Sequence, residues 1–385
     1  MRREYLGFCL FNFLVYLTFG AIAPYINVYF ESLGLTGSQL GTLSSLTSLA
    51  GMVGAPVFGY LADQFLGTKR AFMVVMLLAA GTLILFYYQR LFTYVLLAYM
   101  AYGFFNSAKT PLSDGLLSVY CNRSGHDFSR VRMLGSFGYL FGSFALPALL
   151  GLCGYDAPYI RLAVVVSLAS AALLYFLPEI KVDKKEEKVN VFLAAKELLR
   201  DKRYLFMVFQ YCLAGALVEA FNLYVGNHFI YTLKLDSSVI GLYTVAMVVP
   251  EVFCLFFGQR ILQKVGFKPY FILSSFSQVV RLSIYSFTHS GTLFLAGSLM
   301  HGLTMVALTI GYVRYMSKIV DKRIFSTALS LSYSASMIAC AAYSKVFGML
   351  YQHFGSFAIF YVALAMSILS FVLYLGTKVF DGLEF

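Results

Sequence analysis

Residues Pro111–Tyr139 read PLSDGLLSVYCNRSGHDFSRVRMLGSFGY, and the pattern of this segment governs the interpretation of the whole chain. It is typical of one apolar helix, a basic polar turn and the start of a second apolar helix. Asp114 lies in the first helix, Arg132 begins the second, and Arg123 is midway between them. Residues equidistant from the turn of an antiparallel helical hairpin lie at the same depth. We therefore expect Asp114 and Arg132 to face each other inside a membrane.

A charged side chain at bilayer depth is costly, by about 2.5–3.5 kcal/mol on insertion scales, and it usually marks a solute or ion pathway. Pairing Asp114 with Arg132 would remove much of that cost, and a solute that competes for Arg132 would change the proton affinity of Asp114. The pair therefore predicts a site that couples a proton to a solute. The alternative is a fixed structural salt bridge.

Composition places the chain in a membrane. Hydrophobic residues make up 60% of the 385 residues and charged residues 12%, with a mean hydropathy of +0.76. A soluble protein carries about a quarter charged residues. The net charge of +11 comes mainly from bases in short loops, which favours a membrane protein over a nucleic-acid-binding protein. The six cysteines are scattered without CxxC or metal-ligand spacing, so we expect no disulfide framework, metal site or cofactor.

Twelve apolar segments have about the 20 residues that a membrane-spanning helix needs. Helices satisfy their own backbone hydrogen bonds in lipid, so we predict an all-α membrane protein with twelve transmembrane helices. The first segment is too long for the apolar region of a signal peptide, and we expect it to be retained. The segments are Tyr5–Phe30, Ser38–Ala62, Ala71–Tyr88, Phe92–Tyr120, Met133–Gly154, Ile160–Leu177, Leu205–Leu233, Val239–Leu262, Pro269–Phe287, Thr292–Met316, Phe325–Tyr351 and Ala358–Leu375.

The bases are distributed unevenly between the two sets of loops. If the N-terminus is cytoplasmic, the cytoplasmic segments hold 22 of the 29 Lys and Arg residues, and the opposite loops hold only Arg90, Arg161 and Lys234. Because cytoplasmic loops are enriched in bases, we predict that both termini are cytoplasmic and that the protein lies in the plasma membrane.

The longest polar stretch divides the chain into two halves of six segments. We predict an N-terminal half at residues 1–178, a cytoplasmic linker at 179–203 and a C-terminal half at 204–385. VNVFLAAKELLRDK in the linker has the pattern of an amphipathic helix on the inner membrane surface. The loops GYLADQFLGTKR and GQRILQKVGFK place glycines and bases at equivalent points of the two halves. Two repeated halves around a central site are a known plan of transporters.

The loop Gly59–Arg70 resembles the signature loop of the major facilitator superfamily, G-x-x-x-D-x-x-G-x-[RK]-[RK]. Gly59, Asp63, Gly67 and Arg70 occupy the motif positions, with one extra residue between Asp63 and Gly67. The resemblance implies that this loop is a conformational latch between helices. The extra residue puts the geometry of that latch in question.

Five further segments are similar to one subgroup of this superfamily, which holds lactose permease, nucleoside–proton symporters and 3-phenylpropionate permeases. Glu251 lies where the nucleoside symporters carry a site glutamate, Arg281 on the subgroup's arginine and His301 on its histidine. Thr304 stands where lactose permease has its proton-releasing glutamate, so proton coupling would run through other carboxylates or be absent. The segments are Phe19–Gly41, Pro111–Leu116 with Arg130–Tyr139, Val249–Gly266, Val279–Ser286 and Met300–Met316.

Two groups of polar residues are candidate contacts for the solute. Arg132, Ser136 and Tyr139 share a helix face at i, i+4 and i+7, and Tyr139 can stack on a sugar or base ring. Glu219 and Asn222 share a face at i and i+3 and resemble the polar pair of the nucleoside symporters. We predict that these five residues bind the substrate.

Four residues are candidates for proton coupling. Asp114 is controlled by Arg132 in this hypothesis, Glu251 and His301 exchange protons, and Arg281 balances charge as a partner of Glu251. Structural pairing and ordinary core packing are the alternatives for each of them. Lys109 and Lys345 also lie within spans, and the sequence alone does not assign them a role.

The chain has no P-loop, GxSxG or HExxH motif, which argues against an ATP-driven pump and a hydrolase. We predict a secondary transporter, not an enzyme, that imports a nucleoside, sugar or aromatic acid with a proton, driven by the proton gradient. Its expected partners are the solute, the proton and the lipid bilayer, with no nucleic acid, and we expect a monomer. An exporter or uniporter of the same fold is the alternative, and a transporter-like receptor or membrane enzyme is a remote one.

Overall fold

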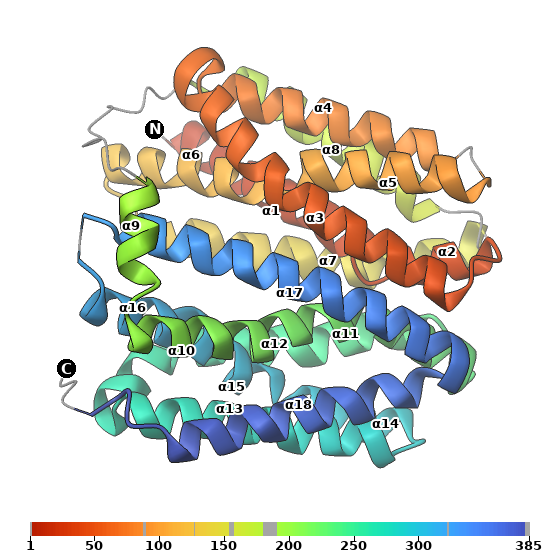
Figure 1. Ribbon diagram of the computed structural model, residues 1–385. Coiled ribbons are helices and arrows are strands. Elements are labelled where there is room, and N and C mark those ends of the chain that lie inside the picture. Colours follow the sequence, from red (N-terminus) through yellow and green to blue (C-terminus); the bar gives the residue numbers. More distant parts are fainter. Residues whose placement is uncertain are drawn as a thin grey trace. The chain divides into compact units, whose positions relative to one another are not determined.

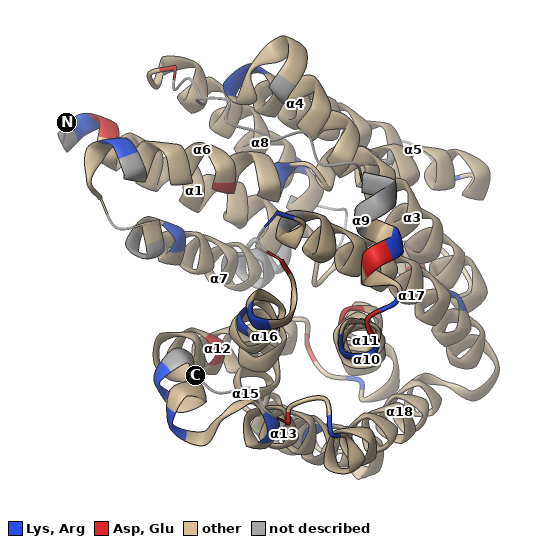
Figure 2. Cartoon of the chain, turned by 60° about the vertical axis from the view of Figure 1, so that its left-hand side comes forward, with Lys and Arg blue, Asp and Glu red and all other residues tan. Residues whose placement is uncertain are grey.

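The computed structural model describes residues 2–87, 90–126, 128–153, 158–179, 191–321 and 323–381. Throughout this part of the chain the regular structure is helical, and no strand occurs in it (Figure 1). The all-α prediction is therefore confirmed. Charged residues lie mainly at helix ends and in connecting segments, and uncharged residues make up most of each helix (Figure 2).

Each of the expected apolar segments coincides with one helix or with a run of consecutive helices. Short turns divide the segments that begin at Tyr5, Phe92 and Thr292, and π-helical turns interrupt the α-helix in the segment that begins at Leu205. In the first half the elements are α1 (Arg2–Ile22), α2 (Ile26–Ser32), α3 (Gly37–Leu61), η1 (Ala62–Leu66), α4 (Thr68–Tyr87), α5 (Phe92–Asn106), α6 (Lys109–Ser124), α7 (Phe128–Cys153) and α8 (Pro158–Phe176).

The second half follows the same plan after a short helix in the expected linker. Its elements are α9 (Val191–Leu198), α10 (Lys202–Tyr211), η2 (Cys212–Ala216), α11 (Leu217–Asn227), η3 (His228–Thr232), α12 (Ser238–Val265), α13 (Phe267–Phe287), α14 (Gly291–Ser298), α15 (His301–Val306), η4 (Ala307–Gly311), α16 (Tyr312–Ile319), α17 (Phe325–Phe354) and α18 (Ser356–Gly376). Among the described residues, 8 helical runs are long and apolar enough by themselves to cross a membrane.

The helices group into two compact units. The first comprises Met1–Lys184, Val225–Ile230 and Asp236–Thr244, and the second comprises Lys185–Tyr224, Tyr231–Leu235 and Val245–Phe385. In the first unit α1 packs against α7, α3 against α5 and α4 against α8, around a core that includes Phe8, Phe72 and Leu117. In the second unit α13 packs against α18 around a core that includes Phe271 and Tyr315. The boundaries expected at residues 178 and 204 stay a prediction.

The repeat between the halves has a common geometry. Gly67 and Gly266 both have a positive φ, 74° and 80°, which a side chain would strain. Two residues after each glycine, a lysine caps the end of a distant helix of its own unit. Lys69 Nζ donates to the carbonyl oxygens of Tyr175 and Leu177, at 2.9 and 2.5 Å, and Lys268 Nζ donates to that of Thr377 at 2.9 Å. The internal repeat in the sequence therefore corresponds to one repeated structural contact.

The extra residue in the signature-like loop is accommodated as a π-helix. Ala62–Leu66 forms this element, η1, at the end of α3 and directly before Gly67. A single π-turn inserts one residue into an α-helix without breaking it, and such turns are frequent at functional sites. The side chain of Asp63 lies outside the described residues, so the latch proposed for it is not described.

Short polar caps begin several helices. Thr36 and Gln39 form a capping box at the start of α3. Asp201 Oδ1 accepts from the backbone N–H groups of Arg203 and Tyr204 at the start of α10. The backbone N–H of Ser238 donates to Asp236 Oδ1 at 2.9 Å and lowers the pKa of Asp236, because it stabilises the charged carboxylate.

The expected amphipathic linker segment is only partly helical. Helix α9 covers Val191–Leu198, Leu198 is buried in the core of the second unit, and Lys196 and Glu197 are exposed. Residues 180–190 lie outside the described part of the chain. The apolar end of α9 is therefore docked on protein.

Candidate functional site

The expected acid–base pair of the first unit is formed. Asp114 on α6 and Arg132 on α7 approach to 3.3 Å between Oδ1 and Nε, and both side chains are about one-third exposed, 31% and 33%. Helix α6 ends at Ser124 and Gly125 turns the chain with φ 71°, so that α7 returns alongside α6. The predicted contact between Asp114 and Arg132 is therefore formed, and both side chains remain partly accessible.

Arg132 is held from the side of α1. Its guanidinium lies over the ring of Tyr16, 4.1 Å from the centroid. Asn12 Nδ2 donates to the carbonyl oxygens of Val131 and Arg132, at 2.8 and 3.3 Å. The backbone and the guanidinium of Arg132 are therefore both positioned by α1. Sequence reasoning did not identify these two α1 residues.

The face of α7 that carries Arg132 also carries Ser136 and Tyr139. All three are half-buried, between a buried stripe that includes Gly135 and Gly138 and an exposed stripe on the other side. A Cβ at Gly138 would collide with the carbonyl of Phe13 on α1, so the glycines bring α7 close to α1. The glycines pack closely against α1, and Arg132, Ser136 and Tyr139 lie beside this α1–α7 contact. The three residues share one helix face, as their i, i+4, i+7 spacing predicts.

A second cluster in the second unit joins an acid, a histidine and an arginine. His301 at the start of α15 lies 3.7 Å from Glu251 on α12, between Nε2 and Oε2. On the other side of the ring, Arg281 Nη1 on α13 is 2.5 Å from His301 Nδ1. The expectation that Arg281 is a partner of Glu251 needs correction, because the arginine contacts His301 and the imidazole connects it to the carboxylate.

This arrangement selects one tautomer of His301. Arginine has only donors, so Nδ1 accepts the hydrogen bond from Arg281 and the imidazole is neutral with its proton on Nε2. That N–H is on the side of Glu251. The separation of 3.7 Å exceeds hydrogen-bond length, so a hydrogen bond from this N–H to the carboxylate needs a small approach of the two groups or one bridging water.

Arg281 is fully buried and held by aromatic rings. Its guanidinium lies 5.0 Å from the ring centroid of Phe221 and 5.5 Å from that of Tyr285, and its exposed fraction is 0%. His301 is 6% exposed, and the side chain of Glu251 is 24% exposed. Accessibility therefore rises from the arginine to the acid, which leaves the carboxylate as the group that can exchange a proton with solvent or solute.

Gly302 allows the helices that carry this cluster to touch. A Cβ at Gly302 would lie 2.6 Å from the backbone C and O of Pro250 and 2.8 Å from the N of Glu251. Such distances do not occur between real atoms without movement, so α12 and α15 approach closely only because residue 302 is glycine. The approach places Glu251 beside His301, the residue before this glycine.

Gly302→Ala is therefore expected to lower the stability of the protein by about 1–3 kcal/mol, the usual cost of overpacking. Gly81→Ala on α4 is the matched control, since a Cβ there meets nothing within 4 Å. Thermal unfolding of the purified protein in detergent measures both. Equal unfolding temperatures for the two variants would contradict the close contact at Gly302.

Glu219 and Asn222 extend from α11 as predicted, one helical turn apart. Glu219 is exposed. Asn222 is half-buried. Both belong to the second unit, as Glu251 does, and their part in substrate binding stays a prediction.

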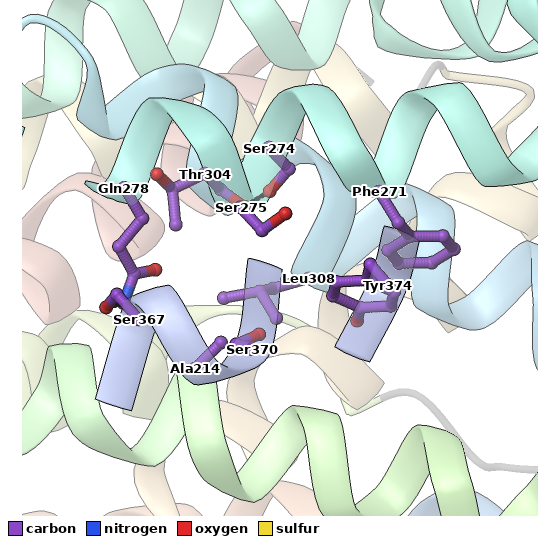
Figure 3. Close-up of a pocket in the computed structure, with 10 residues that line it drawn as sticks. All are labelled: Ala214, Phe271, Ser274, Ser275, Gln278, Thr304, Leu308, Ser367, Ser370 and Tyr374. Atoms are coloured by element: carbon purple, nitrogen blue, oxygen red, sulfur yellow. Dashed lines mark hydrogen bonds between the residues drawn. The ribbon is translucent and has the colours of Figure 1, made fainter. Parts of the chain in front are cut away.

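A small polar cavity lies in the second unit one helical turn from the Arg281–His301 contact (Figure 3). Gln278 Nε2 donates to Ser367 Oγ at 3.0 Å, whereas Gln278 Oε1 and Thr304 Oγ1 are buried without a hydrogen-bond partner among the described residues. Its volume, about 10 Å³, accommodates one water molecule. The cavity is lined by Ala214, Phe271, Ser274, Ser275, Gln278, Thr304, Leu308, Ser367, Ser370 and Tyr374.

Sequence reasoning missed this cavity. Its signal is the spacing of Ser367 and Ser370 on α18 and of Ser274 and Gln278 on α13, which places hydroxyl and amide groups on facing helices. Two π-helices, η2 and η4, also contribute lining residues. Thr304 thus contributes to the wall of this cavity.

Two of the loop residues have little structural constraint. A Cβ at Gly59 meets nothing within 4 Å, and Arg70 is exposed. Lys69, the neighbour of Arg70, instead makes the hydrogen bonds with the end of α8. Gly67 has the positive φ that requires glycine. The latch role of Gly59, Asp63, Gly67 and Arg70 stays a prediction.

Comparison with known proteins adds to this geometry. The model of the MFS_1 like family matches residues 5–362. The transporter YwbF of Bacillus subtilis (strain 168) is 25% identical over 338 residues, covering 86% of this chain and 82% of the relative. The probable 3-phenylpropionic acid transporter of Escherichia coli (strain K12) is 24% identical over 358 residues, covering 89% and 90%.

Among solved structures, the nucleoside transporter NupG superimposes with a TM-score of 0.84 at 16% identity, over 98% of this chain and 99% of that chain. At this identity the likeness shows the fold, which is the major facilitator fold of twelve transmembrane helices. The family match covers most of the sequence and agrees with the helices described above. The chain therefore belongs to the MFS_1 like family of the major facilitator superfamily and is a multi-pass membrane transporter, not an enzyme.

Proposed function

We propose that this transporter takes up a small polar organic solute together with a proton. The observation that carries the proposal is the presence of one acid–base cluster in each unit. Asp114 and Arg132 pair in the first unit, and Glu251 contacts His301 in the second. Ionisable groups inside spans are costly and are retained mainly where they bind a solute or ion.

In the proposed mechanism the solute competes with Asp114 for Arg132. The fork of Arg132 has five donors, and Tyr16 fixes its plane, so a carboxylate or hydroxyl pair on the solute can replace Asp114. Ser136 and Tyr139 lie on the same face of α7 and add polar and ring contacts. Asp114 then loses its cation and takes up a proton more readily.

In the second unit, Glu251 takes up and releases the transported proton. The buried Arg281 keeps His301 in the tautomer whose Nε2–H is directed at that carboxylate. Protonation of Glu251 removes its attraction to His301 and changes the balance between conformations that open to opposite sides of the membrane. Glu219 and Asn222 contact the solute from α11. We assign both termini to the cytoplasm because of the uneven distribution of bases.

The named relatives support an organic solute. One of them is named as a probable 3-phenylpropionic acid transporter, and the structural neighbour is a nucleoside transporter. An aromatic ring is common to both solute classes, and the ring of Tyr16 lies against Arg132. We therefore include aromatic acids and nucleosides, with sugars, in the proposed substrate range.

A uniporter is the second candidate function. Thr304 replaces the glutamate that releases the proton in lactose permease, and this single residue favours transport without a proton. An exporter would run the same cycle in the opposite direction. The response of solute uptake to an imposed proton gradient distinguishes the symporter from the uniporter and the exporter.

The test is uptake into proteoliposomes that contain the purified protein, after a thermal-shift screen of sugars, nucleosides and aromatic acids has identified a ligand. An imposed inward proton gradient is expected to raise the initial uptake rate about tenfold, and a protonophore to abolish the increase. Counterflow that proceeds normally while uptake ignores the gradient would favour the uniporter and refute proton coupling.

A further inference from the structure

A lysine in the first unit is enclosed without a partner. Lys109 is the first residue of α6 and follows the turn Ser107–Ala108, which separates α5 from α6 before Pro111. Its exposed fraction is 0%, and its Nζ has no hydrogen-bond partner in the part of the chain that the structure describes. The ammonium group lies 5.7 Å from the ring centroid of Phe19 and 5.7 Å from that of Tyr102.

Two aromatic rings only partly compensate a buried ammonium group. The nearest acid on the same helix, Asp114, is five residues away, which is about 140° around an α-helix. Asp114 is also already paired with Arg132 at 3.3 Å. Among the described residues, no acidic side chain pairs with Lys109.

The neighbours of Lys109 suit a flat apolar group. Phe19 lies 5.7 Å from Tyr16, the ring that stacks on Arg132, and Tyr102 lies 5.9 Å from Tyr99 in a stacked arrangement. Phe19 of α1 and Tyr102 of α5 are thus the rings beside the ammonium group, and each packs on a further aromatic ring. An aromatic or planar apolar substituent packs well against such rings, whereas a sugar hydroxyl finds few partners among them.

We infer that Lys109 binds the carboxylate of the transported solute, and that the solute is an organic monoanion with an aromatic or planar apolar group. This inference rests on the proposed solute transport and narrows its substrate class. The carboxylate supplies the negative charge that the surroundings of Lys109 lack. A neutral sugar or nucleoside leaves the ammonium group unpaired.

Access to Lys109 requires a ring to move. Tyr102 is 4% exposed, but Phe19 is only half-buried, so Phe19 is the ring that a solute displaces to reach the ammonium group. The ion pair then forms only in the conformation with Phe19 moved. A solute that binds this conformation preferentially shifts the protein toward it, which links recognition of the carboxylate to the conformational change.

The test compares an acid with its neutral isostere in binding to the purified full-length protein. The probes are 3-phenylpropionate and 3-phenylpropanamide, which differ in charge and not in shape. Wild-type protein is expected to bind the acid at least ~30-fold more tightly than the amide, since a buried charge pair is lost with the amide. Lys109→Met is expected to abolish this preference by weakening the acid and not the amide, and Lys109→Arg to retain part of it.

Lys345→Met is the matched control, because Lys345 is the other lysine within a span. It is expected to keep the acid preference. An unchanged preference in Lys109→Met, an amide preference in wild-type protein, or a loss in Lys345→Met alone would each overturn the inference. Methionine has a side chain of similar length to lysine and removes the unpaired charge. Thermal unfolding checks that the Lys109→Met variant is folded. Binding needs no gradient, so this result can fail or succeed independently of proton-coupled uptake.

Discussion

Solute uptake is expected to fall at least ~100-fold when Arg132 is replaced by methionine. Removing one partner of a partly enclosed ion pair leaves Asp114 without its cation, which typically costs about 3–5 kcal/mol when the pair is buried. The pair is one-third exposed, so solvent screening reduces this cost. The larger part of the loss comes from the solute, which no longer meets a fixed fork of donors. Uptake by proteoliposomes measures the change.

Three variants separate the two contributions at Arg132. Arg132→Lys keeps the charge and loses the fork, so it should restore stability but not uptake. Asp114→Asn combined with Arg132→Met removes both charges and should unfold near the wild-type temperature while remaining inactive. Arg161→Met, at an exposed arginine that donates to Tyr87, is the control and should transport normally. Near-normal uptake by Arg132→Met would exclude Arg132 from the substrate site.

Glu251→Gln is expected to abolish accumulation driven by a proton gradient and to preserve counterflow within about threefold. Glutamine has the shape of a protonated glutamate, so the conformational change that needs no proton release continues. Net proton movement through the pair with His301 stops, because the amide at position 251 does not titrate. Uptake under an imposed gradient and counterflow without one, measured on the same proteoliposomes, give the two values.

Glu219→Gln is the comparison for Glu251→Gln, since it neutralises an exposed acid of the same unit. It is expected to change the apparent affinity for the solute and not the response to the gradient. Asp114→Asn should reduce gradient-driven uptake as well. If Asp114→Asn and Glu251→Gln both accumulated solute normally, neither carboxylate would carry the proton.

The sequence predicted the Asp114–Arg132 pair because hairpin geometry requires only a turn and a count of residues. It did not predict that His301 lies between Glu251 and Arg281, since these residues come from three helices whose rotation no spacing specifies. The close approach that sets this rotation depends on Gly302, and a single glycine among 31 carries no distinctive signal. Contacts between residues of one helical hairpin were therefore predictable from the sequence. Contacts between residues of three packed helices were not.

The polar cavity and Lys109 show the same limit. Serines in apolar helices are common, so the cavity between α13 and α18 was not distinguished from ordinary packing. Lys109 was noted as a charge within a span, and only the structure shows that it is fully buried beside Phe19 and Tyr102 with no hydrogen-bond partner among the described residues. The signature-like loop was recognised with one residue too many, and the structure explains the extra residue as the π-helix η1. The extra residue is visible in the sequence, whereas its π-helical conformation is visible only in the structure.

The lysine caps after Gly67 and Gly266 have a mechanical consequence. Each cap joins the beginning of one helix to the end of another helix of the same unit, α4 to α8 through Lys69 and Tyr175 and α13 to α18 through Lys268 and Thr377. The bonded residues are 106 and 109 positions apart in the sequence, so each hydrogen bond closes a long stretch of chain. Because both partners lie in one unit, each contact constrains the packing of that unit's own helices.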